Sequence, residues 1–163
     1  MPTMEEYAKQ PVAERVKRVE RTTDELAAAI RGQSDAILSR RPDATNWAAK
    51  EVVCHLRDIE EFFMGRFAAI MAMDDPKFLP VQPDRWAEER QYLRNDTQAA
   101  LEAFGKRRRE SLAFFATLTP EQWRRGGVHP ARGRMTADDI LALMAYHDDI
   151  HLDQLARALQ GKA

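Results

Sequence analysis

The sequence contains little of what defines several common protein classes. It has a single cysteine, Cys54, among 163 residues, which excludes an internal disulfide and a cysteine-rich zinc module. Its longest strongly apolar run, residues 67–73, is far shorter than the roughly 20 residues of a membrane-spanning helix. The N-terminus is acidic, whereas a secretory signal begins with basic and then apolar residues. We therefore expect a reduced, cytoplasmic protein with no membrane partner.

An excess of charge of either sign is also absent. The chain carries 25 basic and 26 acidic residues, and both halves are balanced. Nucleic-acid binding relies on a basic field that this sequence does not supply, so no nucleic-acid partner is expected. With 44% hydrophobic residues, the chain should fold rather than stay disordered. Its length suits one domain, which we predict over residues 1–163.

Residues that favour strands are scarce. Val and Ile together occur 13 times, whereas Ala, a strong helix former, occurs 25 times. Apolar residues recur at steps of three and four, as in Val12, Val16 and Val19. This periodicity predicts four long helices, at about 11–31, 47–73, 85 or 88 to 118, and 136–159. The predicted fold class is all-α, an antiparallel four-helix bundle.

Local signals set the predicted boundaries of these helices. Thr119 with Gln122, and Thr136 with Asp139, have the spacing of capping boxes at helix starts. Prolines should keep the link at residues 74–84 extended, and this link is long enough to cover part of the bundle. The segment at residues 126–133 is rich in glycine and predicts an irregular loop.

Three of the four histidines fall on the predicted core-facing stripes. His147 and His151 are four residues apart, one helical turn, and His55 is on another helix. An imidazole in an apolar stripe costs free energy unless its ring nitrogens are satisfied, and a divalent cation can satisfy several rings at once. The alternative is three separate histidines, each hydrogen-bonded to its own neighbour. The residues between His147 and His151 do not form the H-E-x-x-H motif, so zinc-protease chemistry is not indicated.

Further polar residues are candidates for roles around such a site. Asp58 follows His55 by three residues and is our candidate for a carboxylate that orients an imidazole. We expect Asp148 and Asp149 to form an ordinary solvated helix face. His129 is a substrate-pocket candidate, although a loop histidine can also simply face water. Arg108 lies on an apolar stripe, where it would meet either an anionic substrate group or a buried acid.

Cys54 and Trp47 have simpler predicted roles. Cys54 should be a small buried residue rather than a nucleophile. Trp47 should pack in the core rather than contact substrate. Neither residue alone indicates a reaction.

Two stretches of the sequence resemble a known family. W-A-A-K-E-V-V-C-H-L-R-D at residues 47–58 and Y-H-D-D-I-H-L-D-Q-L at residues 146–155 are similar to the second-helix and last-helix signatures of the DinB-like superfamily, especially its YfiT-like branch. G-V-H-P at residues 127–130 is also similar to that branch. One departure is visible, because the residue after Trp47 is often Ser or Thr in the family and here is Ala48. We expect Thr45 or Asn46 to cap the helix instead.

The resemblance implies a four-helix bundle that holds a divalent metal, usually zinc or nickel, on His55, His147 and His151. Similar members include thiol S-transferases that use low-molecular-weight thiols such as bacillithiol or mycothiol. Others are regarded as metal-dependent hydrolases, and many are homodimers.

Three protein ligands leave a coordination position open, which is typical of catalytic rather than structural zinc. That position could take water or a thiol, and either would lose its proton more readily there. The ligand set does not choose between hydrolysis and thiol transfer to an electrophilic substrate. The alternative is a non-catalytic metal-binding or stress-response bundle.

Overall fold

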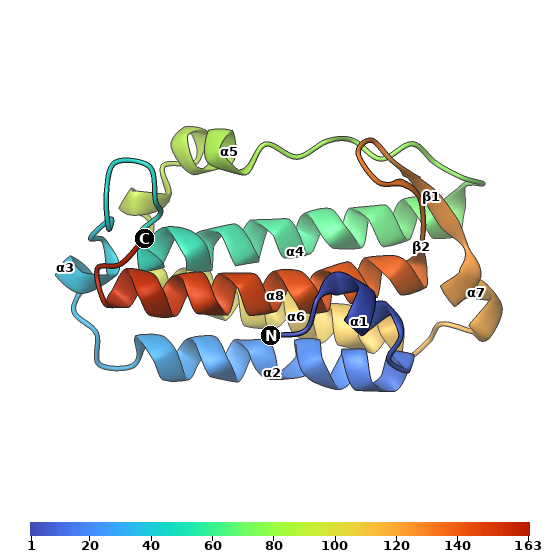
Figure 1. The fold of residues 1–163 in the computed structure, drawn as a ribbon, viewed down its shortest axis with the longest axis horizontal. Coiled ribbons are helices and arrows are strands. Elements are labelled where there is room, and N and C mark those ends of the chain that lie inside the picture. The colour runs from blue at the N-terminus through green and yellow to red at the C-terminus, as the bar shows by residue number, and fades with distance from the viewer.

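Four long helices form a bundle in the computed structural model, which describes residues 1–163 (Figure 1). They are α2 (Val12–Ile30), α4 (Ala49–Ala72), α6 (Thr97–Phe115) and α8 (Ala137–Leu159). The predicted all-α four-helix bundle is confirmed, but it is not antiparallel throughout, because the contacting pairs α4–α6 and α2–α8 run parallel. None of these helices is both long and apolar enough to span a membrane.

Each long helix packs against two others. α4 contacts α6 and α8, and α2 contacts the same two helices, so α4 and α2 are diagonal. The contacting pairs α4–α8 and α2–α6 run antiparallel (Figure 1). The link between Met73 and Asp96 returns along the length of α4, so α6 starts at the same end as α4 and runs parallel to it. This connection places α8 directly beside α4.

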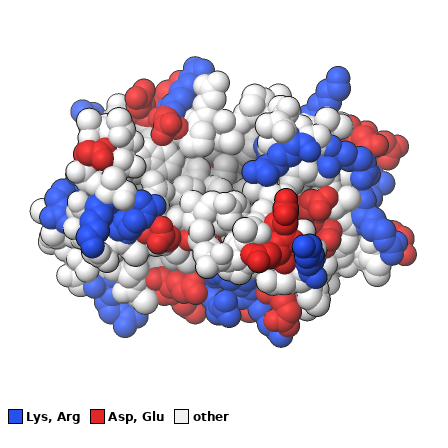
Figure 2. Space-filling model, in the orientation of Figure 1, with Lys and Arg blue, Asp and Glu red and all other residues white.

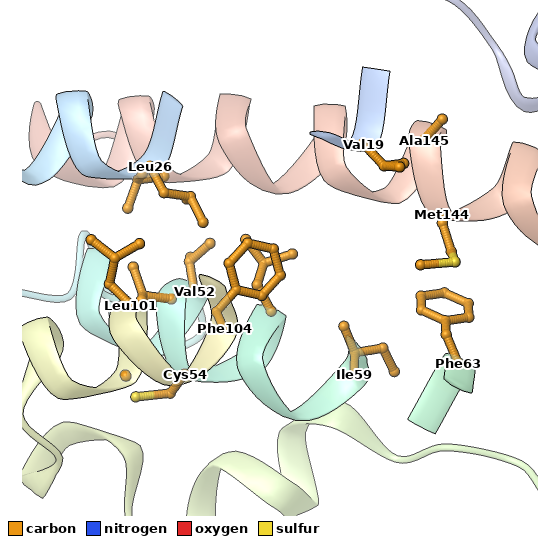
Figure 3. Close-up of a cluster of buried hydrophobic side chains, with 14 of the residues drawn as sticks. Val19, Leu26, Val52, Cys54, Ile59, Phe63, Leu101, Phe104, Met144 and Ala145 are labelled. Carbon is orange, nitrogen blue, oxygen red and sulfur yellow. The ribbon is translucent and has the colours of Figure 1, made fainter. Parts of the chain in front are cut away.

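A continuous apolar core fills the space between the four helices. Figure 3 shows side chains from α2, α4 and α6 meeting near one end, among them Leu26, Val52 and Phe104. Towards the other end, Phe63 of α4 faces Met144 of α8. All five side chains are buried. Burial of such side chains, at about 1.5–3 kcal/mol each, is the main stabilisation that holds the helices together.

The connections carry shorter elements. They are α1 (Met4–Ala8), α3 (Asp35–Leu38), α5 (Pro83–Glu89), the 3-10 helix η1 (Tyr92–Arg94) and α7 (Pro120–Arg124). The prediction that the third long helix begins at residue 85 or 88 is wrong. Gln91 adopts a left-handed conformation after α5, and the Asp96 side chain caps α6 by accepting a hydrogen bond from the Ala99 amide. Apolar periodicity does not register such a break, because α5 also buries an apolar residue.

The prediction of an irregular loop at residues 126–133, in a fold without strands, is wrong, because residues 126–136 contain two short strands. β1 (Gly126–His129) and β2 (Gly133–Thr136) form an antiparallel hairpin. The 74–82 link joins it, since the Phe78 amide donates to the Val128 carbonyl at 2.9 Å and the Val128 amide donates to the Pro76 carbonyl at 2.8 Å. Strands of four residues are too short to show alternation in sequence.

The start of α4 also differs from the prediction. Ala48 occupies the N-cap position, and its amide donates to the Glu51 side chain at 2.9 Å. The side chains of Thr45 and Asn46 instead bond to Asp43, so neither residue caps the helix. The predicted capping boxes at Thr119 and Thr136 are both present.

Candidate metal centre

Three imidazole rings meet between α4 and α8. The Nε2 atom of His147 lies 3.2 Å from Nε2 of His55 and 3.1 Å from Nε2 of His151. All three ligand atoms lie within 4.8 Å of one another. Nitrogen ligands about 2.1 Å from a tetrahedral cation are separated by about 3.4 Å. The histidines that the sequence singled out are therefore brought together at a spacing that suits one divalent ion.

The packing of two helices creates this arrangement. His147 and His151 lie one turn apart on the same face of α8 and are partly exposed. His55 comes from the facing side of α4 and is 1% exposed. Because α4 and α8 are neighbours in the bundle, the three rings point into one space.

Burial keeps all three rings neutral. It lowers the pKa of His55 to about 3, with a further lowering by His151. Burial, together with the other two histidines, lowers the pKa of His147 well below its usual value. Burial also lowers the pKa of His151, although Gln154 and Asp148 oppose this shift. Neutral imidazoles present the lone pairs that a cation requires.

Aromatic and amide side chains hold the rings in place. Trp47 packs against His55 with ring centroids 5.0 Å apart and stacks on His151 at 6.2 Å. Phe63 meets His147 edge-on at 5.6 Å. The Gln154 Oε1 atom lies 2.7 Å from Nδ1 of His151, and donation from Nδ1 leaves the Nε2 lone pair free. Sequence reasoning missed Gln154, although its position three residues after His151 on one helix was an available signal.

The donor set of these histidines fits a cation. Three neutral nitrogens converge, and no carboxylate or thiol takes a fourth position in the cluster. The Nδ1 atoms of His55 and His147 are buried without a protein hydrogen-bond partner, so only His151 has its ring oriented by a hydrogen bond from the protein. In most metal sites each ligand histidine has such a partner. The rings of His55 and His147 are positioned mainly by packing.

A second buried polar cluster joins α4 and α8 to α6. Arg108 of α6 makes paired contacts with Glu60 of α4 at 2.9 and 2.8 Å and with Asp148 of α8 at 2.6 and 3.2 Å. Ser111 donates to Glu60 at 2.6 Å, and Thr22 donates to Asp148 at 2.6 Å. Burial lowers the pKa of Arg108, but the two carboxylates outweigh it and the net shift is upward. Arg108 thus meets buried acids, the second of the two predicted alternatives, and is remote from solvent.

The acids next to His147 do not form the solvated face that we predicted. Asp148 is 2% exposed and belongs to the Arg108 cluster. Asp149 is half-buried and accepts hydrogen bonds from Arg18 at 2.7 Å and from Tyr7 at 2.5 Å. Both acids attach α8 to other elements of the fold, which fixes the helix that carries two of the histidines.

Asp58 does not orient an imidazole as predicted. Its carboxylate accepts hydrogen bonds from Arg57 at 2.7 Å, Arg90 at 2.7 Å and the Tyr92 hydroxyl at 2.9 Å. Burial raises the pKa of Asp58, but these donors outweigh it and lower the pKa to about 2. The side chain points to the α5–η1 segment because that segment covers α4 there.

The remaining candidates lie outside the cluster. His129 is on β1, and its Nδ1 accepts from the Ala131 amide at 3.1 Å. It is not among the residues that could share the ion. Cys54 is fully buried, and burial raises the pKa of its thiol to about 11, which suits the predicted structural role. Trp47 is buried as predicted, and it also contacts two of the histidines.

The face shown in Figures 1 and 2 has an uncharged recess. Lys, Arg, Asp and Glu side chains surround it, and it overlies the region where α4 and α8 run side by side (Figure 2).

Comparison with known proteins supports the fold and identifies the family. The family model of the DinB superfamily matches residues 18–155. YfiT of Bacillus subtilis (strain 168), whose name proposes a metal-dependent hydrolase, is 24% identical over 138 residues, 84% of this chain and 78% of its own. OB0413 of Oceanobacillus iheyensis (strain HTE831) has a name that proposes the same activity. It is 23% identical over 158 residues, 93% of this chain and 87% of its own.

A solved structure of Bacillus subtilis YfiT has the same fold. It superimposes with a TM-score of 0.85 at 21% identity and covers 100% of this chain and 92% of that one. That structure is described as a metal-dependent hydrolase candidate with an unusual four-helix-bundle topology. In this chain, the parallel course of α4 and α6 departs from a simple up-and-down bundle.

Proposed function

The chain belongs to the DinB superfamily, and from this premise we propose that it is a metal-dependent enzyme whose divalent ion, zinc or nickel, is held by His55, His147 and His151. The observation that carries the proposal is the convergence of three neutral Nε2 atoms at 3.1 and 3.2 Å. The relatives named as hydrolases support the same type of chemistry. The reaction delivers water or a low-molecular-weight thiol to an electrophilic small molecule, by hydrolysis or by thiol S-transfer.

The chemistry follows from the donor set and its surroundings. A bound divalent cation would act as a Lewis acid and lower the pKa of a water or thiol beside it. Gln154 holds the Nδ1 proton of His151, which keeps its Nε2 turned towards the other rings. Trp47 and Phe63 place apolar surface against the histidines and exclude bulk water on those sides. The Arg108 cluster fixes α8 relative to α4 and so keeps the rings at ligand distance.

The proposal also covers the cellular location of the protein and its binding partners. It places the protein in the reducing cytoplasm, which the lone buried Cys54 supports. Its partners are a thiol or electrophilic substrate and a second copy of the chain, with no nucleic acid and no membrane. Light scattering tests the homodimer.

Elemental analysis of protein purified without chelator tests the metal centre. We expect about one equivalent of zinc or nickel per chain, and His151→Ala should lose most of it because two ligands remain. His129→Ala is the matched control and should retain the metal, since His129 lies outside the cluster. Chelation should lower the melting temperature of the parent protein, because a ligand present at about a hundred times its Kd stabilises the native state by about 3 kcal/mol.

Activity separates the enzyme from a non-catalytic bundle. Nitrophenyl acetate reports hydrolysis, and chlorodinitrobenzene with cysteine, bacillithiol or mycothiol reports thiol transfer. Turnover that disappears with both chelation and His151→Ala supports the proposal. Equal metal content in His151→Ala and the parent protein would contradict the proposed metal site. A metal-containing protein that is inactive in every assay would favour the metal-binding or stress-response alternative.

A further inference from the structure

A separate cleft runs along α4 beyond the histidines. Its volume is about 510 Å³, within the range of small-molecule sites. Phe62 and Arg66 of α4, Phe78 of the 74–82 link, and Trp86 and Arg90 of α5 lie in its wall. None of the three histidines lines this cleft.

Arg66 is the unusual residue in this wall. It is 6% exposed, yet it makes no ion pair, and its only hydrogen bond is from Nη2 to the Leu79 carbonyl at 3.3 Å. Its Nε is buried without any partner. A buried guanidinium normally has a carboxylate beside it, because an uncompensated charge is costly away from water. Arg66 therefore retains unused donors at the surface of a cleft.

The acidic residues of the cleft do not neutralise Arg66. Asp58 is occupied by Arg57 and Arg90, as described above. Glu61 pairs with Arg107 at 2.6 Å. The unpaired charge that faces the cleft is therefore positive, and the exposed Lys77 adds to it.

Three aromatic residues of the wall lie around Arg66 or beside one another. The Arg66 guanidinium lies between two of them, 4.7 Å from the Phe62 ring and 5.3 Å from the Phe78 ring. Phe62 also meets Trp86 edge-on at 5.5 Å. Contacts between a guanidinium and aromatic rings help to hold the guanidinium in place, and its N–H donors can then make a paired contact with an oxyanion.

We propose that this cleft binds the oxyanion of a small organic molecule, a carboxylate or a phosphate, on Arg66, with the apolar part of that molecule against Phe62 and Trp86. The guanidinium supplies two parallel donors to the oxyanion, and the rings shield the pair from water. The substrate class is thus an organic anion with an apolar or aromatic body.

The position of the cleft connects it with the candidate metal centre. Arg66 follows His55 by 11 residues on α4, about 16 Å along the helix axis. Phe62 lies between them, and its neighbour Phe63 contacts His147. A molecule anchored at Arg66 can therefore extend along α4 towards the histidines. This last step rests on the proposed function, whereas anion binding by Arg66 does not.

Titration of the full-length protein with phenylacetate, phenyl phosphate and neutral phenylacetamide, followed by NMR, tests the site. We expect at least one of the two anions to bind more tightly than the amide, and the tighter anion identifies the oxyanion. Arg66→Met should weaken anion binding about ten- to hundredfold, because a charge-assisted contact is lost, and leave the amide unaffected. Arg85→Gln is the control: it removes an exposed charge paired with Glu89 outside the cleft, and binding should persist.

The same titration on chelated protein and on His151→Ala separates this site from the metal centre. Anion binding that persists in both supports the Arg66 site even if no metal-dependent turnover is found. Anions that bind no better than phenylacetamide, or that bind Arg66→Met as well as the parent protein, would overturn the proposal. If Arg66→Met fails to fold, Arg66→Lys keeps the charge but loses the planar pair of donors, and unchanged anion affinity in that variant would also overturn it.

Discussion

The Arg108 cluster and the histidine cluster are both polar, both include residues of α4 and α8, and are built in opposite ways. In the first, Glu60 and Asp148 surround the guanidinium, and each carboxylate accepts a further hydroxyl hydrogen bond. In the second, the Nε2 atoms of His55, His147 and His151 face one another, and two Nδ1 atoms have no protein partner.

This difference separates structural polar groups from groups arranged for a ligand. Polar atoms that satisfy one another fix the relative positions of helices, and they have no capacity left for an outside molecule. Polar atoms that converge without satisfying one another raise the free energy of the native state until something binds them. Arg66 belongs to the second kind, although it binds an anion rather than a cation in our proposal.

The largest effect on stability should come from breaking the Arg108 cluster, in which the polar atoms hydrogen-bond to one another. Arg108→Met leaves two buried carboxylates without a counter-charge and should lower the free energy of unfolding by about 3–5 kcal/mol, measured by urea denaturation. Arg107→Met removes the same charge one position earlier on α6, where the pair with Glu61 is partly exposed. It should cost about 1 kcal/mol or less. Similar losses in the two variants would show that the Arg108 cluster is not the structural tie described here.

A smaller effect on stability should come from replacing Asp58. Its carboxylate, like that of Asp148, is fully hydrogen-bonded, but it lies beside the cleft. Because its folded pKa of about 2 is below the ordinary 3.8, the unfolded chain binds the proton more readily. The stabilisation, about 2 kcal/mol, is therefore present above pH 4 and disappears as pH falls from 4 towards 2. Asp58→Asn should be less stable than the parent protein at neutral pH, with the difference shrinking over that range in acid-dependent urea denaturation. A difference that is constant with pH would contradict this account.

Gln154→Met should have the smallest effect on stability and a clear effect on metal affinity. Loss of the acceptor at Nδ1 of His151 should weaken metal binding about tenfold, measured by competition with a chelating dye. The chelated variant should unfold within about 0.5 kcal/mol of the chelated parent protein, because Gln154 ties no helices together. Gln98→Met, on the exposed side of α6, should leave metal affinity unchanged. A stability loss without a change in affinity would place Gln154 with the structural residues.

Much of the fold could be predicted from local sequence. Helix spans followed from apolar residues recurring at steps of three and four, and the capping boxes at Thr119 and Thr136 marked two starts correctly. The break before Thr97 and the hairpin at residues 126–136 could not be predicted in this way. The first depends on one left-handed residue, and the second on hydrogen bonds to a link about fifty residues earlier in the chain.

The sequence by itself determined which residues could hold a metal, because helical periodicity places His147 and His151 on one face and His55 on the core side of another helix. Only the tertiary structure decided what each nearby charge does. Asp58 was predicted to orient an imidazole and Asp148 to face solvent, and Arg108 had two possible roles. The groups that they bond to lie far away in the sequence. The unpaired state of Arg66 is likewise a property of the packed molecule, because the absence of a partner can be established only when every neighbour of the side chain is known.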